Sequence, residues 1–445
     1  MIREQFPEGW TAPSDWTVVP LSEAVEQIDY GLSAPIPKTV PENGFPIVST
    51  ADISKSGRIL YEKIRRTSAP EKTASRLTLR EGDLLFNWRN SAELIGKTGV
   101  FTEQSEPHIF ASFILRIRCD ETKIHNLFLA YLMNYYREAR IFVNLARRAV
   151  NQANYNRNEI SVLKIPRPPY DEQRKIAAVL GLVQRAIEQQ EQLIALAVEL
   201  KKALLHKLFT EGLRGEPQKQ TEIGAVPEGW EETTLGKLAA KPHGFLQTGP
   251  FGSQLHKHEY LSEGVGVVNP THLWGNRINH EDIPRVSKET VARLERHCLE
   301  AGDILFARRG QIKRHGLVTK TEEGWLCGTG CFLARVHHEH IDNRFLSYLF
   351  STPGVIAWLN SHSAGAIMPN LNNTVLRSMP VFYPMFDVQV EIADCLDACE
   401  QKMINHVRKK ESLSDLFRTL LHQLMTAQIR VRNRDMMDLE ALFKE

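Results

Sequence analysis

Arginine follows a short apolar segment at two places in the sequence. One is Asn87-Trp88-Arg89-Asn90 and the other is Ala307-Arg308-Arg309-Gly310. The N–H groups of a guanidinium form a fork that fits a phosphate or the edge of a guanine base. Further basic residues follow each segment, and the candidate contacts to nucleic acid are Asn87, Arg89, Lys97, Arg308, Arg309, Lys313 and Arg314. Such residues are also common on surfaces that bind only water, and that interpretation stays open.

Amide side chains gather near the end of each half of the chain. They can read adenine or donate to phosphate, but they equally suit turns and helix caps, and both interpretations stay open. A third loop, Gly249-Pro250-Phe251-Gly252-Ser253-Gln254, has no counterpart in the first half, which fits two halves that contact different sequences. These segments add as candidates Asn151, Gln152, Asn154, Tyr155, Arg157, Ser253, Gln254, Asn370, Asn372 and Asn373.

Two segments resemble catalytic motifs but lack a residue that the motif requires. Gly96-Lys97-Thr98 resembles the end of a phosphate-binding loop, but Ser91 stands where that loop needs glycine. Pro168-Pro169-Tyr170 resembles the tail of an adenine methyltransferase motif, but Arg167 precedes it and cannot accept a hydrogen bond from an adenine amino group. We therefore expect neither segment to act as a catalytic motif, and we do not expect this chain to transfer a methyl group by itself.

The cysteines predict neither a disulfide framework nor a metal site. Six cysteines are scattered over 445 residues without framework spacing, which favours reduced thiols. Cys327 and Cys331 lie near His337, but their spacing suits zinc poorly.

Composition limits the class of protein. The chain is 42% hydrophobic and 24% charged, which is typical of globular proteins, and its length suggests about three units. The net charge is only +2, so a surface that binds nucleic acid must be a local patch. No apolar run reaches the roughly 18 residues of a membrane span, and the first ten residues do not resemble a signal peptide. We expect a cytoplasmic protein that does not contact membranes.

The sequence repeats itself once over most of its length. Five blocks of the first half occur again in the second half, in the same order. For the first block, Pro7-Glu8-Gly9-Trp10 is an alternative match, so the alignment of the N-terminus stays open. The paired blocks are Pro13-Ser14-Asp15-Trp16 with Pro227-Glu228-Gly229-Trp230, residues 79–86 with 299–306, 112–116 with 331–335, Asp171-Glu172-Gln173 with Asp387-Val388-Gln389, and 204–208 with 420–424.

Each repeat ends in a long segment with a heptad pattern. Apolar residues recur at alternating steps of three and four, interrupted at Gln190 and Lys201 in the first segment. Asp171 and Asp387 are expected N-caps, and Gly212 is expected to close the first helix. The residues expected to pack the two helices together are Ile176, Leu180, Val183, Ile187, Leu204, Leu208, Ile392, Leu396, Met403, Leu420 and Leu424.

Helices of roughly 40 residues would each be on the order of 60 Å long. An apolar face of that length must pack against another element, and the other long helix is the obvious one. If the two helices pair antiparallel, the two repeats are related by a pseudo-two-fold rotation, which matches the symmetry of duplex DNA. Each repeat could then read a half-site. The alternative is that these are core helices of two ordinary domains.

Taken together, the ordered motifs resemble the specificity subunits of type I restriction–modification systems. The resemblance rests on the P-x-x-W starts, the G-D-[IL]-L-F strands, the amide-rich loops, and the D-x-Q helices that end in L-L-H-x-L. It implies an α+β fold, with two globular target recognition domains separated by two long antiparallel coiled-coil helices. The expected segments are 1–168 and 213–385 for these domains, 169–212 and 386–430 for the helical spacers, and 431–445 for a charged tail.

The same resemblance implies a subunit without catalysis of its own. Such a subunit binds an asymmetric two-part sequence in double-stranded DNA and assembles with two methylation subunits and two restriction subunits. S-adenosylmethionine, ATP and Mg²⁺ would come with those partners, and this chain would bind none of them. Arg185, Glu188, Lys202 and Arg408 on the helices are candidates for docking. The alternatives are a coiled-coil scaffold and the DNA-binding part of a self-contained methyltransferase–nuclease.

Overall fold

The computed structural model describes residues 10–33, 44–145, 147–149, 152–240, 242, 244–337, 339–363 and 370–431. The chain divides into two compact units, which we call unit 1 (Met1–Glu191 and Arg408–Glu445) and unit 2 (Gln192–Val407). Both long helices are shared between the units. The segment boundaries expected at 168, 212, 385 and 430 stay predictions, and residues 432–445 of the expected tail lie outside the described residues.

Unit 1 combines a four-stranded antiparallel sheet, in the order β2-β9-β5-β7, with a three-stranded sheet, in the order β4-β3-β8. A separate pair, β1 with β12, brings the start of the repeat next to its end. The strands are β1 (Thr17–Pro20), β2 (Val25–Tyr30), β3 (Phe45–Val48), β4 (Arg65–Thr67), β5 (Leu84–Asn87), β6 (Arg89–Asn90), β7 (Thr98–Val100), β8 (Ile109–Phe110), β9 (Ile114–Cys119), β10 (Arg147–Ala149), β11 (Gln152–Asn154) and β12 (Lys164–Arg167). The helices are α1 (Glu71–Leu77), α2 (Asn126–Glu138), α3 (Ile141–Leu145), α4 (Arg157–Ser161) and the first part of α5 (Tyr170–Thr210).

Unit 2 has the sheets β16-β24-β21-β22 and β20-β17-β23, and the pair β15 with β25. The hairpins β13–β14 and β18–β19 complete its strands. The strands are β13 (Gln218–Thr221), β14 (Gly224–Pro227), β15 (Glu231–Thr234), β16 (Phe245–Thr248), β17 (Val265–Val268), β18 (Leu273–Trp274), β19 (Arg277–Ile278), β20 (Arg285–Val286), β21 (Ile304–Ala307), β22 (His315–Leu317), β23 (Leu326–Cys327), β24 (Cys331–Arg335) and β25 (Pro380–Tyr383). The helices are α6 (Leu235–Leu238), α7 (Lys288–Arg293), α8 (Asn343–Phe350), α9 (Pro353–His362), α10 (Asn373–Ser378), the second part of α5 and the first part of α11 (Phe386–Met425), whose remainder belongs to unit 1.

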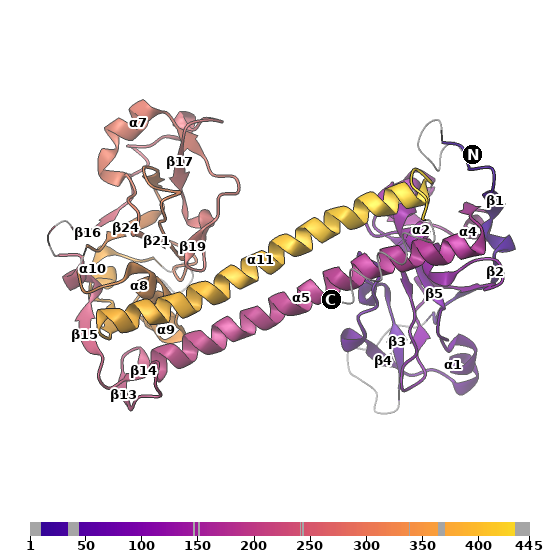
Figure 1. Ribbon diagram of the computed structural model, residues 1–445, viewed down its shortest axis with the longest axis horizontal. Coiled ribbons are helices and arrows are strands. Elements are labelled where there is room, and N and C mark those ends of the chain that lie inside the picture. Colours follow the sequence, from indigo (N-terminus) through magenta and orange to yellow (C-terminus); the bar gives the residue numbers. More distant parts are fainter. Residues whose placement is uncertain are drawn as a thin grey trace. The chain divides into compact units, whose positions relative to one another are not determined.

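The two units share one topology, which confirms the internal repeat. Figure 1 labels equivalent strands of the two units, such as β5 and β21. Both four-stranded sheets are antiparallel and have the same order of equivalent strands. In the equivalent three-stranded sheets β4-β3-β8 and β20-β17-β23, the central strand pairs antiparallel with one neighbour and parallel with the other. The fold is therefore α+β, with two repeated units and two long helices.

The strand pairing corrects one block of the repeat. Matching 112–116 with 331–335 made Arg116 the equivalent of Arg335. In the sheets, however, Phe86 pairs with Leu115 and Phe306 pairs with Phe332. Arg118 is therefore the equivalent of Arg335, and the sequence match is wrong by two residues. Strand β9 carries arginine at two alternating positions, so the sequence pattern alone fits both registers.

The two long helices run antiparallel, as the resemblance stated from sequence implied. In unit 1, Glu172 near the start of α5 pairs with Arg430, and Glu191 pairs with Lys410 at 3.0 Å. In unit 2, the Cys399 thiol donates to the Ala197 carbonyl at 3.7 Å. Helix α5 has 41 residues and α11 has 40, in agreement with the expected length.

The residues expected to pack the spacer are buried or half-buried, but many belong to the globular cores. Ile176 and Leu180 pack in the main core of unit 1, together with Leu424 of α11. Ile392 and Leu396 pack in the main core of unit 2. Burial of each such side chain contributes about 1.5–3 kcal/mol. Leu208 also belongs to the core of unit 2, Leu204 packs against that core, and Leu420 packs against the core of unit 1. The ends of the helices are therefore parts of the two globular units, while Val183, Ile187 and Met403 are buried or half-buried elsewhere on the helices.

The predicted N-caps are wrong by two residues. Helix α5 begins at Tyr170 and α11 at Phe386, so Asp171 and Asp387 lie in the first turn. Carboxylates there still interact favourably with the helix dipole. The expected end of α5 is correct, because Gly212 follows it with a φ of +67°.

The glutamine of the first D-x-Q motif anchors the start of α5. Gln173 is fully buried, and its Oε1 accepts from the backbone N–H of His125 at 2.8 Å. Its amide group donates to the carbonyls of Pro168 at 2.9 Å and Lys123 at 3.2 Å. The helix is therefore tied to the loop that precedes α2.

Gln389 makes the equivalent contacts in unit 2. Its Oε1 accepts from the backbone N–H of Asp342 at 3.0 Å, and its amide donates to the carbonyls of Pro384 at 2.8 Å and His340 at 2.9 Å. The D-x-Q motif thus has a structural role in both repeats.

In the part of the chain that the structure describes, no helix is long and apolar enough to cross a membrane. The same residues contain no group of three or more His, Cys, Asp or Glu side chains arranged to hold a metal ion. Cys327 and Cys331 are buried, and burial raises the pKa of the Cys331 thiol.

Candidate nucleic-acid interface

The G-D motif before each arginine-bearing segment fixes a turn. Gly82 and Gly302 have φ of +84° and +96°, which favours glycine. Asp83 accepts two hydrogen bonds from Arg118, at 2.8 and 2.7 Å, and this pairing raises the pKa of Arg118. Asp303 accepts two from Arg335, both at 2.8 Å. These buried pairs hold the central strands β5 and β21, from which the candidate residues emerge.

The structure brings the arginine-bearing and amide-rich segments together in unit 1. Strand β6 pairs with β11, so that Arg89 lies opposite Asn154. The backbone N–H of Tyr155 donates to the Trp88 carbonyl at 2.9 Å. Arg89 is exposed, and its guanidinium lies over the ring of Phe113 at 5.2 Å. The two sets predicted from sequence therefore form one surface.

Unit 2 repeats this pairing residue for residue. Arg309 forms a β-bridge with Asn370. The backbone N–H of Leu371 donates to the Arg308 carbonyl at 2.9 Å, as Tyr155 does to Trp88. Arg309 is exposed, whereas Arg308 is half-buried with its guanidinium 5.9 Å from the ring of Phe332. Basic and amide groups thus adjoin one another at the same place in both repeats.

Most of the predicted contacts are accessible. Lys313 and Arg314 continue the surface from Arg309, and the loop before β17 exposes Ser253 and Gln254. Asn372 is exposed, but its Oδ1 caps α10 by accepting from the Val375 N–H at 2.8 Å, so this amide serves as a helix cap. The accessible or half-buried candidates are Arg89, Asn154, Arg157, Ser253, Gln254, Arg308, Arg309, Lys313, Arg314, Asn370, Asn372 and Asn373.

Three predicted contacts are wrong because their side chains are buried. The Asn87 amide donates to the Leu94 carbonyl at 3.1 Å, and the Tyr155 hydroxyl donates to the Phe142 carbonyl at 2.8 Å. The Lys97 ammonium donates to the carbonyls of Thr50 and Ile53, and burial lowers its pKa. These groups hold loops in place and cannot reach DNA.

The structure does not describe the side chains of two further candidates. Asn151 lies outside the described residues, and Gln152 is described only as part of strand β11. Their predicted contacts to DNA stay predictions.

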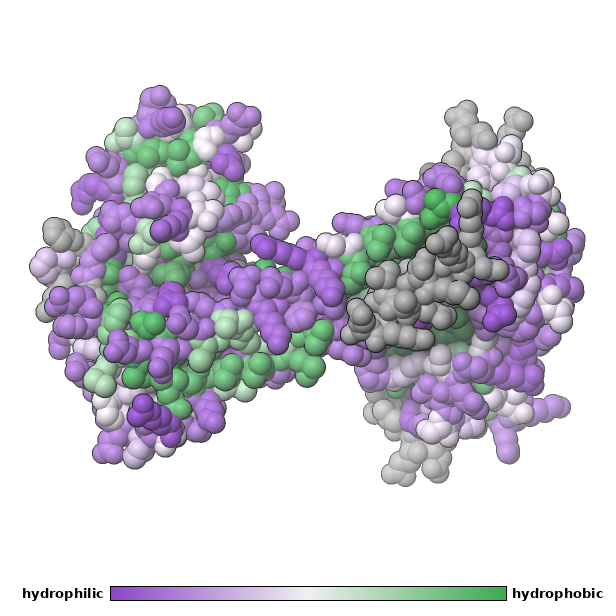
Figure 2. Space-filling model, in the orientation of Figure 1, coloured by the Kyte–Doolittle hydropathy of each residue, from purple (hydrophilic) through white to green (hydrophobic). Residues whose placement is uncertain are grey.

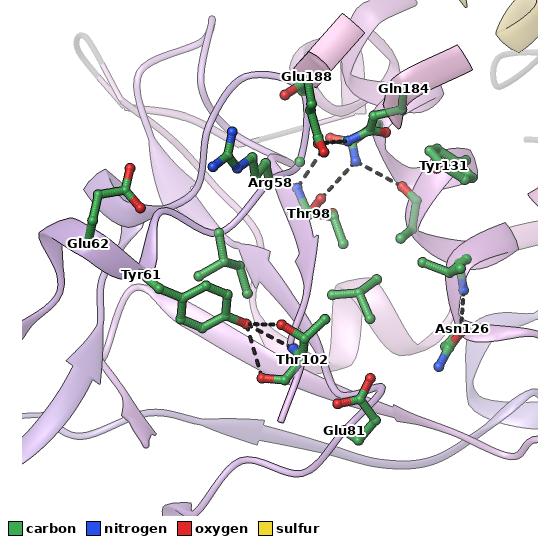
Figure 3. Close-up of a pocket in the computed structure, with 17 residues that line it drawn as sticks. Arg58, Tyr61, Glu62, Glu81, Thr98, Thr102, Asn126, Tyr131, Gln184 and Glu188 are labelled. Atoms are coloured by element: carbon green, nitrogen blue, oxygen red, sulfur yellow. Dashed lines mark hydrogen bonds between the residues drawn. The ribbon is translucent and has the colours of Figure 1, made fainter. Parts of the chain in front are cut away.

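A cavity of about 440 Å³ opens in unit 1 beside α2 and α5. Figure 3 shows Arg58, Gln184 and Glu188 at one end of it, and Tyr61 and Glu81 at the other. Carboxylates outnumber cationic groups among its lining residues, so the cavity is unsuited to phosphate. It does not belong to the candidate nucleic-acid interface.

The equivalent region of unit 2 is filled by ionic contacts. Glu400 of α11, the equivalent of Gln184, is only 5% exposed. It pairs with Arg277 at 2.7 Å and Lys201 at 3.2 Å, and it accepts from the Tyr348 hydroxyl at 3.0 Å. Burial, together with the nearby carboxylates, raises the pKa of Tyr348. Because Arg277 belongs to β19, this buried carboxylate fixes the β18–β19 hairpin to the long helices.

One exposed aromatic residue was not selected from the sequence. Trp274 lies at the end of β18, before the turn at Gly275, and is 70% exposed. Its signal in the sequence is a tryptophan directly before a Gly-Asn turn, which the sequence reasoning did not use.

Comparison with known proteins agrees with this geometry. The profile of the type I restriction modification DNA specificity domain matches residues 13–196 and again 227–414. The chain belongs to the type I restriction–modification specificity family. Each match covers one repeat and extends into its long helix, so the resemblance stated from sequence is confirmed.

Members of this specificity family in Methanocaldococcus jannaschii resemble the chain over nearly its whole length. It is 29% identical to the MjaX specificity subunit over 94% of this chain and 95% of that protein. It is 24% identical to the MjaVIII specificity subunit, over 97% of both proteins. The crystal structure of a type I S subunit from M. genitalium has the same fold, with a TM-score of 0.58 and 17% identity over 92% of this chain and 96% of that one.

Proposed function

We propose that this chain reads a two-part, asymmetric DNA sequence within a type I restriction–modification complex, one part with each repeat. The observation that carries this proposal is the shared register of the two candidate surfaces. In each unit an exposed arginine lies opposite an asparagine, Arg89 with Asn154 and Arg309 with Asn370. Arginine and asparagine forks are the side chains best suited to guanine and adenine edges.

The same surfaces differ in their remaining residues, and this difference supports an asymmetric target. Unit 1 has Trp88 and Asn90 beside its exposed arginine, whereas unit 2 has Arg308 and Gly310 at those positions. Two copies of one scaffold with different contact residues would read two different half-sites. The phosphate contacts would position each unit, and the base contacts would give it specificity.

The chain is proposed to have no catalytic site. Methyl transfer and DNA cleavage would be carried out by two methylation subunits and two restriction subunits, which would bind S-adenosylmethionine, ATP and Mg²⁺. Both motifs that resemble catalytic sites fail by sequence, and in the structure Lys97 is buried among backbone carbonyls. Such a lysine is not available to a nucleotide phosphate.

The long helices offer a surface for the partner subunits. Figure 2 shows hydrophobic side chains exposed along α5 in unit 2, where Leu193, Leu196 and Leu200 are between 39% and 67% exposed. Exposed apolar patches commonly mark protein interfaces. Arg185, Lys202 and Arg408 are also exposed on the two helices, while Glu188 is half-buried. Arg185, Glu188 and Arg408 of unit 1, and the three leucines and Lys202 of unit 2, are the residues proposed to dock methylation subunits on each unit.

Selection from random duplexes tests this proposal against a coiled-coil scaffold. The assembled complex of this chain with its methylation subunit would be incubated with random-sequence DNA, and the bound fraction sequenced. We expect enrichment of a sequence with two specified parts and an unspecified gap. Recovery of no sequence preference would favour the scaffold.

A methylation assay tests the second alternative, a self-contained methyltransferase–nuclease. The purified chain would be mixed with DNA and radiolabelled S-adenosylmethionine, with and without the methylation subunit. We expect incorporation of label only when the partner is present. Methylation by the chain alone would contradict the proposal.

A further inference from the structure

The β18–β19 hairpin of unit 2 presents a tryptophan to solvent. Trp274 is 70% exposed, although an indole ring normally gains stability from burial. The hairpin that carries it is held firmly: Trp274 pairs with Arg277 across the strands, and Arg277 is bound to the buried carboxylate of Glu400. The Asn276 carbonyl also accepts from the backbone N–H of Leu317 in β22 at 2.9 Å. The exposed ring therefore lies on a hairpin that is bound both to α11 and to β22.

The surroundings of the ring are basic. The Arg314 guanidinium lies 5.9 Å from the Trp274 ring centroid, in the range of a cation–π contact. Lys313 and Gln311 line the same hollow of about 350 Å³, and no carboxylate is among its lining residues. A surface that combines an aromatic face with cations and lacks acids is complementary to a polyanion that also offers apolar edges, as nucleic acid does.

This basic hollow is continuous with the candidate interface. The carbonyl of Arg314 accepts from the backbone N–H of Ala307 at 2.9 Å, which places Arg314 next to the start of the Arg308–Arg309 segment. Arg309 in turn pairs with Asn370. One loop, residues 308–314, thus joins the proposed base-reading residues to the hollow beside Trp274.

The equivalent positions that the structure describes in the first repeat, Ser54 and Lys97, do not form this arrangement. The hairpin positions Ile53 and Leu273 are equivalent, so Ser54 stands where unit 2 has Trp274. The pairing of β5 with β7 and of β21 with β22 makes Lys97 the equivalent of Arg314. Lys97 is turned inward and bonded to two backbone carbonyls. Among the described residues, the exposed tryptophan and the accessible arginine at these equivalent positions therefore belong to the second repeat.

We infer that Trp274 and Arg314 contact duplex DNA beside the half-site read by the second repeat. The indole packs against a deoxyribose or a base edge, and the arginine held over its ring reaches a phosphate. This inference rests on the proposed function. A protein partner is the other class of molecule that an exposed tryptophan could bind, and the experiment separates the two.

The test uses the complex of the full chain with its methylation subunit and a duplex that carries the target found by random-sequence selection. Affinity is measured for the wild type, W274A, W274F, R314A and the control M385A, which removes an apolar side chain that is 80% exposed. We expect W274A to weaken binding roughly tenfold, because the indole loses its burial against DNA, and W274F to restore most of it. R314A is expected to make the dependence of log affinity on log salt concentration less steep. The slope should fall by about 1, the amount that corresponds to one phosphate contact. M385A is expected to bind as the wild type does.

Two further readouts identify the contact. Tryptophan fluorescence should change on addition of DNA, and part of that change should be missing in W274F. Assembly of W274A with the methylation subunit, measured without DNA by sedimentation, should equal that of the wild type. Loss of assembly in W274A would assign Trp274 to a protein interface and overturn the inference, as would unchanged DNA affinity in W274A. A wild-type complex with no preference for its target would instead contradict the proposed function.

Discussion

Gln173 and Gln389 are equivalent residues that bind equivalent backbone atoms at the starts of α5 and α11. Each buried side chain accepts from the N–H of the residue just before a shorter helix and donates to two carbonyls. Each therefore connects a long helix to the globular part of its own unit. The same set of hydrogen bonds therefore fixes the start of each long helix.

Replacement of either glutamine by alanine is expected to destabilise its unit. The variants Q173A and Q389A each leave one buried N–H and two carbonyls without this partner, at a cost of about 1–3 kcal/mol in the free energy of unfolding. Urea unfolding would measure the loss. The control Q184A removes a half-buried glutamine of the same α5 helix and is expected to cost less than about 0.5 kcal/mol. Equal stabilities of Q184A and Q173A would contradict the anchoring role.

The pH dependence of stability is expected to report on His315. This buried imidazole shares a hydrogen bond of 2.8 Å with the Ser347 carbonyl, and burial lowers its pKa to about 4. The unfolded chain has an ordinary histidine pKa near 6.5, so between these two values only the unfolded state takes up a proton. Stability should therefore fall as the pH drops from about 6.5 to about 4, by about 3 kcal/mol in total.

The variant H315T is the matched test, because the equivalent residue of unit 1 is Thr98. Urea unfolding at several pH values between about 7.5 and 4.5 should show a shallower decline for H315T than for the wild type. The comparison isolates His315, since burial also lowers the pKa of His125, His272 and His297. Parallel declines in the two proteins would show that His315 does not carry the effect.

Sequence reasoning predicted the repeat and the helices because their signals extend over many residues. The heptad pattern runs through all of α5 and α11, so single interruptions such as Lys201 did not hide it. The helix starts were misplaced because aspartate is a good N-cap in general, whereas here the helices begin one residue earlier than the aspartates. The preference of aspartate for N-caps does not show that a buried glutamine two positions later, Gln173 or Gln389, determines where the helix begins.

The candidate interface could be predicted only in part. Arg89 and Arg309 are found where basic residues were expected, beside the amide-rich segments. Lys97 and Asn87 were misjudged because their polarity indicates a surface, yet Asn87 donates to a carbonyl of its own loop and Lys97 donates to two carbonyls of the segment 50–53. The burial of a polar side chain depends on which carbonyls the fold leaves unpaired, and one sequence does not contain that information.

Lengthening both helices is expected to change the gap between the two half-sites. One heptad would be inserted between Glu191 and Gln192 and another between Val407 and Arg408, the positions at which the two compact units meet along each helix. Seven residues add about 10 Å of helix, which corresponds to about three base pairs. Random-sequence selection with the lengthened complex should therefore return the same two half-sites with a longer gap. An unchanged gap would rule out a spacer role for the helices.

Exchange of one repeat tests most directly the central claim, that each repeat reads its own part of the target. Residues 213–385 would be replaced by the corresponding segment of another specificity subunit, and methylated positions would be mapped in DNA from cells that carry the chimaera and its partner subunits. The account predicts that one half of the methylated sequence changes while the other half stays the same. A change in both halves, or in neither, would contradict it.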